Sequence, residues 1–501
     1  MINLSPKAFL DEVKKGGIPS LFSEMAYTDA FAVYQSIGER KYTVFLDSAK
    51  GTSKIARYSF IATDPYLIFR LKNGEVEVED RTCGRRTASY RAPLERMHEL
   101  IAVYPQQPDP ELPPFQGGAI GLFSYDFARY IEKLPEHAID DLSIPDAHFL
   151  FFDTILAFDH PARRAWIICA PGARSTGLGY RDIQDIDWPA AYDEAEAKIL
   201  KQVSMTVMTA PERGYAACGI PRLRISAIQH EMAKEKYMGI VEKAKEYIAA
   251  GDIFQANLSQ RISAEIGTAD PWRIYEVLRE VNPSPFAAYA DFGDYQIASS
   301  SPERLVEMRD GIIETRPIAG TRPRGKDVAE DILMRSELLL NEKERAEHIM
   351  LIDLERNDIG RVSRYGSVLV DELMITEDYS HVIHIVSNVR GFVNDGMTCL
   401  DVVRAAFPGG TITGVPKVRC MEIIDELEPV RRGPYTGSLG YIGFSGNMDL
   451  NIIIRTFVIK DGRVYIQVGA GIVADSDPER EYYETLKKAE ALVKTLDKFV
   501  K

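Results

Sequence analysis

The sequence has few cysteines, no long uninterrupted apolar run and no excess of basic residues. Its five cysteines are scattered and form no Cys-x-x-Cys pair: Cys83, Cys169, Cys218, Cys399 and Cys420. This pattern indicates neither a disulfide framework nor a zinc site, and it fits a reducing cytoplasm. The richest apolar stretch, residues 148–158, is interrupted by Asp153, and the N-terminal segment shows no apolar signal core. We therefore expect no membrane segment.

The charge balance argues against a nucleic-acid partner. The chain has 60 Lys and Arg residues against 74 Asp and Glu residues, which gives a formal net charge of −14. Phosphate binding needs a dense basic stripe, whereas clusters such as Arg431-Arg432 are short and flanked by acids. The apolar fraction of 45% and the absence of low-complexity tracts are typical of a globular protein.

The length indicates more than one domain. At about 100 to 200 residues per domain, a chain of 501 residues suggests two or three. Residues 205–224 mix Pro, Gly and small side chains between two helical segments, which favours a boundary there. We predict an N-terminal companion domain over residues 1–215 and a second domain over residues 225–501.

Local patterns predict both hairpins and helices. Asn-Gly or Asp-Gly pairs at residues 73–74, 310–311 and 461–462 lie between alternating or apolar runs, and each predicts a two-residue β-hairpin. Hairpins mixed with separate helices favour an α+β fold with antiparallel sheets. Helical periodicity is found over residues 188–203, 231–249, 271–281, 329–354, 416–427 and 478–496.

Two of these helices carry glutamates three residues apart, Glu344 with Glu347 and Glu481 with Glu484. Residues with this spacing share one helix face. Most such pairs are solvated surface groups, and Glu484 could simply pair with Lys488 one turn on. Four carboxylates from two helices could also bind a hard cation, and ligation by oxygen alone suits Mg²⁺ better than zinc.

Other residues have a functional and a structural interpretation. Arg455 lies in an apolar run that reads as a strand, where a buried guanidinium needs an anion, either a substrate carboxylate or a structural acid. Glu303 follows a Ser-Ser-Ser-Pro turn and could be a general acid or an ordinary turn residue. His381 and His384 lie among β-branched residues, where core histidines are common. Gly469–Gly471 follows a predicted strand and could turn backbone amides toward an anion.

Ordered motifs across residues 228–495 resemble the chorismate-utilising enzyme family. They read GDIFQANLSQR, SSSPERL, ETRPIAGTRPRG, NEKERAEHIMLIDLERNDIGRVS, YSHVIHIVSNV, FPGGTITGVPKVRCMEIIDELEP, GPYTGSLGYIGFSGNMDLNIIIRT and VGAGIVADSDPEREYYETLKKA. VFLDSAKG, ARYSFIATDPY and FQGGAIGLFSYDFARYIEKLP resemble the family's companion domain. The resemblance implies antiparallel β-sheets packed as a sandwich with helices outside, the anthranilate synthase component I-like fold. It makes residues 225–501 the chorismate-binding catalytic domain.

The resemblance also assigns roles. It implies Mg²⁺ held directly by Glu347 and Glu484, with Glu344 and Glu481 supporting it through water. Glu303 matches the general acid that protonates the departing hydroxyl, and His384 matches an active-site histidine near the ring carboxylate. The substrate-binding positions would be Gly320, Thr321, Tyr435, Arg455, Gly469, Ala470, Gly471 and Lys488.

Gln255 is a third candidate catalytic position. Family members that add water resemble this chain except for a lysine base at this position. Because an amide cannot deprotonate water at neutral pH, amination of chorismate is favoured. The sequence shows no G-x-G-x-C-x-G-x-Q amidotransferase motif, so ammonia is expected from a separate glutamine amidotransferase subunit.

Two aminating branches stay open. FLDSA, SPERL, ETRPI and TITG resemble the folate-side branch, which makes 4-amino-4-deoxychorismate. Ala319 weakens this assignment without reversing it, because many folate-side members have a nucleophilic lysine there but some lack it. We therefore expect 4-amino-4-deoxychorismate, and the alternative is the tryptophan-side branch, which makes anthranilate and pyruvate. The tryptophan pocket of feedback-regulated relatives would lie near Ser48 and residues 282–286. A catalytically silent chorismate or tryptophan sensor is a further alternative, disfavoured because the candidate site residues are retained.

Overall fold

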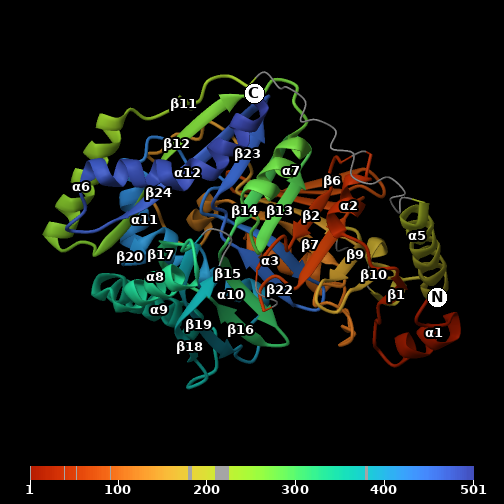
Figure 1. Ribbon diagram of the computed structural model, residues 1–501. Helices are drawn as coiled ribbons and strands as arrows, with labels where there is room; N and C mark the ends of the chain where they lie inside the picture. Colours follow the sequence, from red (N-terminus) through yellow and green to blue (C-terminus); the bar gives the residue numbers. More distant parts are fainter. Residues whose placement is uncertain are drawn as a thin grey trace.

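The computed structural model describes residues 2–38, 40–51, 54–90, 92–178, 183–208, 225–378 and 382–500. Within these residues the chain forms two large sheets whose ladders are antiparallel (Figure 1). The first sheet has the order β1 (Leu21–Met25), β10 (Arg164–Cys169), β9 (Thr154–Asp159), β3 (Tyr58–Ala62), β2 (Val44–Asp47), β13 (Phe286–Asp291), β14 (Tyr295–Ser301), β23 (Thr456–Lys460), β24 (Arg463–Ile472), β12 (Gln255–Glu265) and β11 (Gln229–His230), and β20 (Gly414–Val415) pairs with β12.

The second sheet contains the strands that carry much of the candidate site. It has the order β17 (Ile318–Pro323), β19 (Val382–Phe392), β16 (Ile312–Thr315), β15 (Arg304–Arg309), β22 (Met448–Asn451), β21 (Ser438–Gly443), β7 (Gly118–Phe123), β8 (Ala147–Phe152), β4 (Leu67–Lys72), β5 (Glu75–Asp80) and β6 (Arg85–Ser89), and β18 (Leu369–Asp378) pairs with β19.

The α-helices of the described residues are α1 (Pro6–Lys14), α2 (Ala30–Gln35), α3 (Pro93–Ala102), α4 (Ala173–Thr176), α5 (Trp188–Met208), α6 (Lys234–Ala250), α7 (Pro271–Val281), α8 (Val328–Leu340), α9 (Glu342–Gly360), α10 (Cys399–Ala406), α11 (Lys417–Leu427) and α12 (Pro478–Val500). Short 3-10 turns are η1 (Tyr125–Tyr130), η2 (Ile183–Asp185) and η3 (Gly410–Ile412). Among these helices, none combines the length and the apolar composition that crossing a bilayer requires.

The two sheets pack face to face as a sandwich. Ile168 of β10 in the first sheet shares a buried cluster with Ile120 of β7 and Leu150 of β8 in the second. Helices cover the outer faces, as Leu278 of α7 and Leu492 of α12 do on the first sheet. Burying one such side chain contributes about 1.5–3 kcal/mol, so the layers are held mainly by apolar contact. The predicted α+β sandwich is confirmed.

The three predicted hairpins are confirmed. Residues 73–74, 310–311 and 461–462 join β4 to β5, β15 to β16 and β23 to β24. The first residue of each turn has φ of 50–51° and the glycine has φ of 71–80°. Two consecutive positive φ angles are what a type I′ turn requires, and Asn-Gly and Asp-Gly adopt them readily.

The prediction of one helix over residues 329–354 is wrong, because two helices, α8 and α9, cover these residues. α8 ends at Leu340, and α9 begins at Glu342 after the extended residue Asn341. The Asn341 side chain accepts a hydrogen bond from the Glu344 N–H at 3.0 Å. Asparagine is a favoured N-cap, so it starts a new helix where apolar periodicity alone runs on.

The two predicted domains share both sheets. β2 pairs with β13, and β7 pairs with β21, so strands from either side of the predicted boundary lie next to each other. Residues 209–224, which include the boundary at residue 215, lie outside the described residues. The division into residues 1–215 and 225–501 stays a prediction.

Candidate active site

Gln255 links the first sheet to helix α9. At the start of β12, its Nε2 donates to Glu347 Oε1 at 3.1 Å. A carboxylate only accepts hydrogen bonds, so this contact fixes the amide with its nitrogen toward Glu347 and its oxygen away. The structure therefore joins a candidate catalytic position to a candidate metal ligand.

The other three candidate metal ligands also have intramolecular partners. Arg322 donates to Glu344 Oε1 at 2.7 Å, and the Ser476 hydroxyl donates to Glu481 Oε1 at 2.7 Å. Lys488 lies 2.9 Å from Glu484 Oε1, which is the surface pair that the helical spacing allows. Burial, and then repulsion from Glu484, raises the pKa of Glu481.

The two helices that carry these glutamates approach each other. Lys343 of α9 lies 3.0 Å from Asp475 in the loop before α12. Glu344 Oε2 is buried and lacks a hydrogen-bond partner among the described residues. An all-oxygen donor set with such an oxygen fits Mg²⁺ in ligand chemistry. Within the described residues, however, no three acidic, His or Cys side chains are grouped closely enough to form a cation site as they stand.

Glu303 has the properties of a general acid. It lies between β14 and β15 with 7% of its surface exposed. Burial raises the pKa of Glu303 to about 7, against smaller opposing effects of the Thr411 hydroxyl, the Ile318 N–H and Arg455. A carboxyl group with a pKa near neutrality can hold a proton and release it during a reaction.

His384 on β19 is held as a neutral ring. Its Nδ1 lies 3.1 Å from the Gly320 carbonyl oxygen and 3.1 Å from Thr321 Oγ1. Because the carbonyl only accepts, the network assigns the proton to Nδ1. Burial lowers the pKa of His384 to about 4, and Arg455 adds to this effect. His381 lies outside the described residues.

The prediction that Arg455 is a buried residue of a strand is wrong. β22 ends at Asn451 and β23 begins at Thr456, and Arg455 is a half-buried residue in the bend between them. Its φ of 52° is in the left-handed region. Such a conformation costs about 1–3 kcal/mol for a residue other than glycine, so it needs support from its surroundings. Arg455 influences the pKa of both Glu303 and His384, which places the three side chains in one region.

The prediction that Gly469–Gly471 follows a strand is wrong, because these residues lie inside β24. Ala470 pairs with Leu258 and Gly471 with Asn257 in the ladder with β12. The ladder with β23 ends at Ile466, so these residues have one neighbouring strand. These residues extend the strand because β24 continues past the end of its hairpin partner β23.

The remaining substrate-binding candidates gather at Gly469. A Cβ atom at position 469 would lie 2.8 Å from the Tyr435 hydroxyl and 2.5 Å from Asn257 Oδ1. Lys488 Nζ donates to the Gly469 carbonyl oxygen at 3.1 Å. Glycine therefore lets the strand approach the buried Tyr435 closely.

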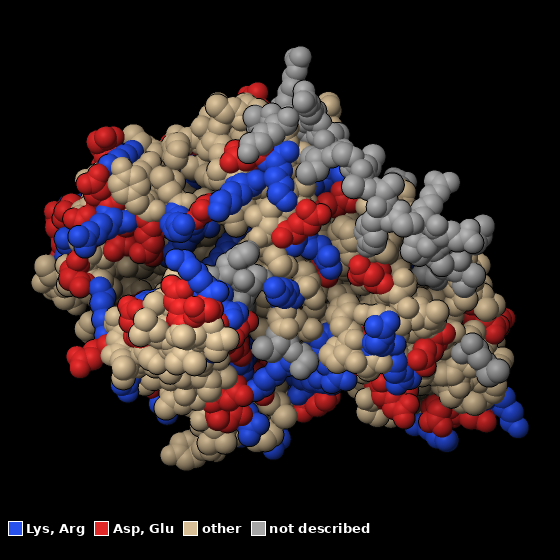
Figure 2. Space-filling model, viewed as in Figure 1, with Lys and Arg blue, Asp and Glu red and all other residues tan. Residues whose placement is uncertain are grey.

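The surface between two groups of helices is hollowed and basic. Figure 2 shows Lys and Arg side chains around a hollow between the part of the molecule formed by α6 and α12 and the part formed by α8 and α9. Positive charge around a recess attracts an anionic ligand. Sequence reasoning missed two residues here, Arg322 and Asn257. Arg322 follows Gly320 and Thr321 in the same motif, and Asn257 lies two residues after Gln255 on the same strand face.

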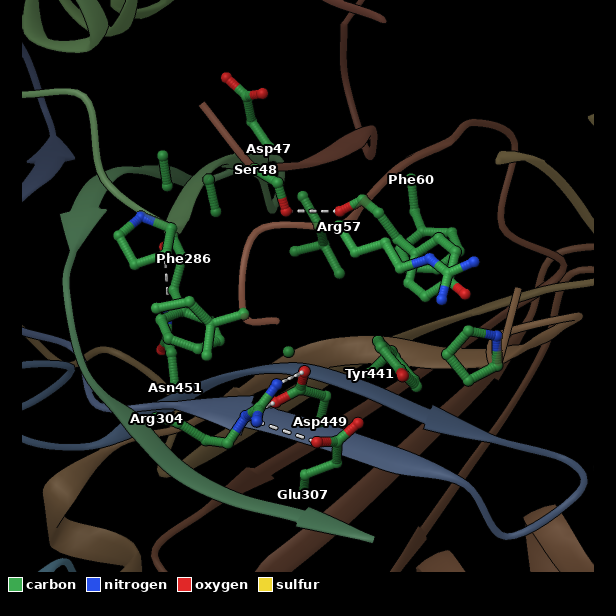
Figure 3. A pocket seen from close by; sticks show the side chains of 18 of the residues that line it. Asp47, Ser48, Arg57, Phe60, Phe286, Arg304, Glu307, Tyr441, Asp449 and Asn451 are labelled. Carbon is green, nitrogen blue, oxygen red and sulfur yellow. Dashed lines mark hydrogen bonds and ion pairs between the residues drawn. The ribbon is translucent and has the colours of Figure 1, made fainter. Parts of the chain in front are cut away.

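A separate cavity of about 230 Å³ lies between the sheets (Figure 3). Ser48 and Phe286 both line it, as the resemblance to feedback-regulated relatives predicts. Ser48 donates to the Tyr58 carbonyl oxygen at 2.6 Å, and Arg304 pairs with Asp449 at 2.8 Å. None of the candidate catalytic or metal-binding residues lines this cavity. Tryptophan binding there stays a prediction.

The α+β sandwich thus holds a buried acid and a neutral histidine that both respond to Arg455, and glutamate pairs on two helices that approach each other, which are groups suited to acid–base chemistry. The family model described as chorismate binding enzyme matches residues 41–494. The chain is 44% identical over 460 residues to aminodeoxychorismate synthase component 1 of Bacillus subtilis (strain 168), covering 91% of this chain and 92% of that protein. It is 42% identical over 466 residues to anthranilate synthase component 1 of Acetivibrio thermocellus, covering 93% and 92%.

A solved structure agrees with these sequence comparisons. Anthranilate synthase component I from Streptococcus pneumoniae TIGR4 matches with a TM-score of 0.76 and 35% identity, covering 93% of this chain and 97% of that chain. The chain belongs to the chorismate binding enzyme family. The predicted family and fold are thereby confirmed, and the protein is a chorismate-utilising enzyme.

Proposed function

We propose that the chain aminates chorismate with ammonia. The observation that carries this proposal is Gln255, whose amide is tied to Glu347 at the position where water-adding relatives have a lysine base. An amide cannot activate water, whereas ammonia already has a nucleophilic lone pair. The lone pair forms the C–N bond as the ring C–O bond breaks. Glu303 gives its proton to the departing hydroxyl, which leaves as water, and the new ammonium group returns a proton to Glu303.

The other candidate residues bind substrate and metal in this proposal. Arg455, Tyr435 and the backbone at residues 469–471 hold the enolpyruvyl carboxylate, and Lys488 balances its charge. Gly320, Thr321 and His384 face the ring. Glu347 and Glu484 would hold Mg²⁺ directly, with Glu344 and Glu481 acting through water. Bound Mg²⁺ would supply charge neutralisation at a substrate carboxylate.

For the product we propose 4-amino-4-deoxychorismate, the precursor of para-aminobenzoate and folate. Support comes from FLDSA, SPERL, ETRPI and TITG and from the 44% identical relative. Anthranilate is the second candidate, because Ala319 is a buried residue of β17 whose methyl group cannot attack the ring. Without a lysine at this position, C4 would be aminated directly.

A product assay tests this choice. The purified chain is incubated with chorismate, Mg²⁺ and an ammonium salt, with and without an aminodeoxychorismate lyase. We expect 4-aminobenzoate by chromatography only when the lyase is present, and little anthranilate fluorescence. Anthranilate as the main product without lyase would replace the proposal with the second candidate. Heat-inactivated protein controls for spontaneous breakdown of chorismate.

A partner assay tests the source of ammonia. Both relatives above are named component 1, which supports a second component for this chain too. We expect no product from the purified chain with glutamine alone, and product once a cognate glutamine amidotransferase subunit is added. With an ammonium salt in place of glutamine, the same preparation should form product without the subunit. This control shows that the site is active. Product from glutamine with the lone chain, shown by mass spectrometry to be free of glutaminase, would contradict this expectation.

A further inference from the structure

Two amide oxygens on one face of β12 are buried without a hydrogen-bond partner among the described residues, Gln255 Oε1 and Asn257 Oδ1. Gln255 is 7% exposed, and its contact with Glu347 turns the oxygen away from that carboxylate. Residues two apart on a strand point to the same side. Buried acceptors are normally satisfied in folded proteins, so two neighbouring unpartnered oxygens on one strand face can accept hydrogen bonds from a bound donor.

The spacing of the two amides is close to what one small donor can bridge. Alternate residues of a strand are about 6.6 Å apart, and two N–H···O contacts span about 5.8 Å, so one nitrogen reaches both oxygens if the side-chain ends lie about 1 Å closer together than the Cα atoms. Opposite them, β24 has glycines. A Cβ atom would lie 2.5 Å from Asn257 Oδ1 at position 469, and 2.5 Å from Gln255 Nε2 at position 471. Glycine at both positions leaves the room that the amides occupy.

We propose that Asn257 and Gln255 form the acceptor site for the ammonia nucleophile, an inference that rests on the proposed amination of chorismate. Two N–H groups of ammonia donate to Asn257 Oδ1 and Gln255 Oε1, and the lone pair stays directed at the ring. Ammonium has no lone pair, and two uncharged acceptors in a buried setting favour the uncharged species. Asn257 is thus a binding residue for the second substrate, while Glu303 and His384 serve chorismate.

Steady-state kinetics with Asn257→Val test the site. Valine removes the acceptor and keeps the strand, because β-branched residues favour extended backbone. With chorismate saturating, the KM for free ammonia is expected to rise roughly ten-fold, the effect of one lost hydrogen bond, while the KM for chorismate changes less than about two-fold. Asn257→Asp keeps an acceptor oxygen and should restore the KM for ammonia to within about three-fold of the original value.

Ser263→Ala is the matched control, because Ser263 Oγ is also buried on β12 without a hydrogen-bond partner among the described residues. It lies six residues from Asn257 and should leave both KM values unchanged. If the valine variant does not fold, Asn257→Ala replaces it in the same assay. Thermal unfolding is measured for each variant. An unchanged KM for ammonia in a folded Asn257 variant, with active wild type, refutes this site alone. Wild type that does not aminate chorismate refutes the proposed function and the site with it.

Discussion

Glu303→Gln is expected to lower kcat for chorismate amination by roughly 10²- to 10⁴-fold, the usual contribution of a general acid. Glutamine keeps the size and burial of the side chain but has no acidic proton for the departing hydroxyl. The KM for chorismate should change by only a few-fold, because the proton is transferred in the transition state. Steady-state rates with ammonia as the nitrogen source measure both constants.

The pH dependence of the wild type gives a second test of Glu303. Its protonated form is the active one, and burial raises its pKa to about 7. At a fixed concentration of free ammonia, kcat should therefore fall as the pH rises through about 7, and Glu303→Gln should lack this step.

Glu355→Gln is the matched control for the pH profile. Glu355 is 4% exposed, and burial with repulsion from Asp358 raises its pKa to about 8, but it has no proposed contact with substrate. This variant should keep both the rate and the step near pH 7. If Glu303→Gln retained the wild-type rate and profile, another group would be the acid.

Local chemistry made part of the fold predictable. The three hairpins follow from Asn-Gly and Asp-Gly pairs, because the turn conformation is a property of those two residues. The break at Asn341 was missed, since apolar periodicity continues across it and only the capping contact reveals it. The glutamate pairs could be placed on shared helix faces by spacing, yet their partners Arg322 and Gln255 come from distant elements.

Long-range packing explains the other errors. The bend at Arg455 depends on a positive φ that the apolar run around it does not signal. Gly469 suggested a loop because glycine is common in turns, whereas here it makes room for Tyr435 and Asn257 from other strands. Close approach of this kind depends on the assembled sheets, so a single sequence does not indicate it.

Glu347→Ala and Glu484→Ala are each expected to reduce Mg²⁺-dependent turnover by at least roughly 10³-fold, since a bound cation contributes several kcal/mol of charge stabilisation. These two residues are proposed as direct ligands, one from each helix, so removal of either breaks the site. Both variants should fold, because Glu347 contacts Gln255 and Glu484 contacts Lys488 without other hydrogen bonds in the described structure.

Metal binding itself separates a lost ligand from a general loss of activity. Mn²⁺ bound in place of Mg²⁺ can be counted by electron paramagnetic resonance without any turnover. Both alanine variants should bind it far more weakly than the wild type. Glu490→Ala, a variant further along α12 whose side chain pairs only with Lys487 and Lys494 among the described residues, should bind it normally. If either Glu347→Ala or Glu484→Ala turned over chorismate at near the wild-type rate in the presence of EDTA, the four glutamates would not be a metal site. Their pairing with Arg322, Gln255, Ser476 and Lys488 would then be their whole role.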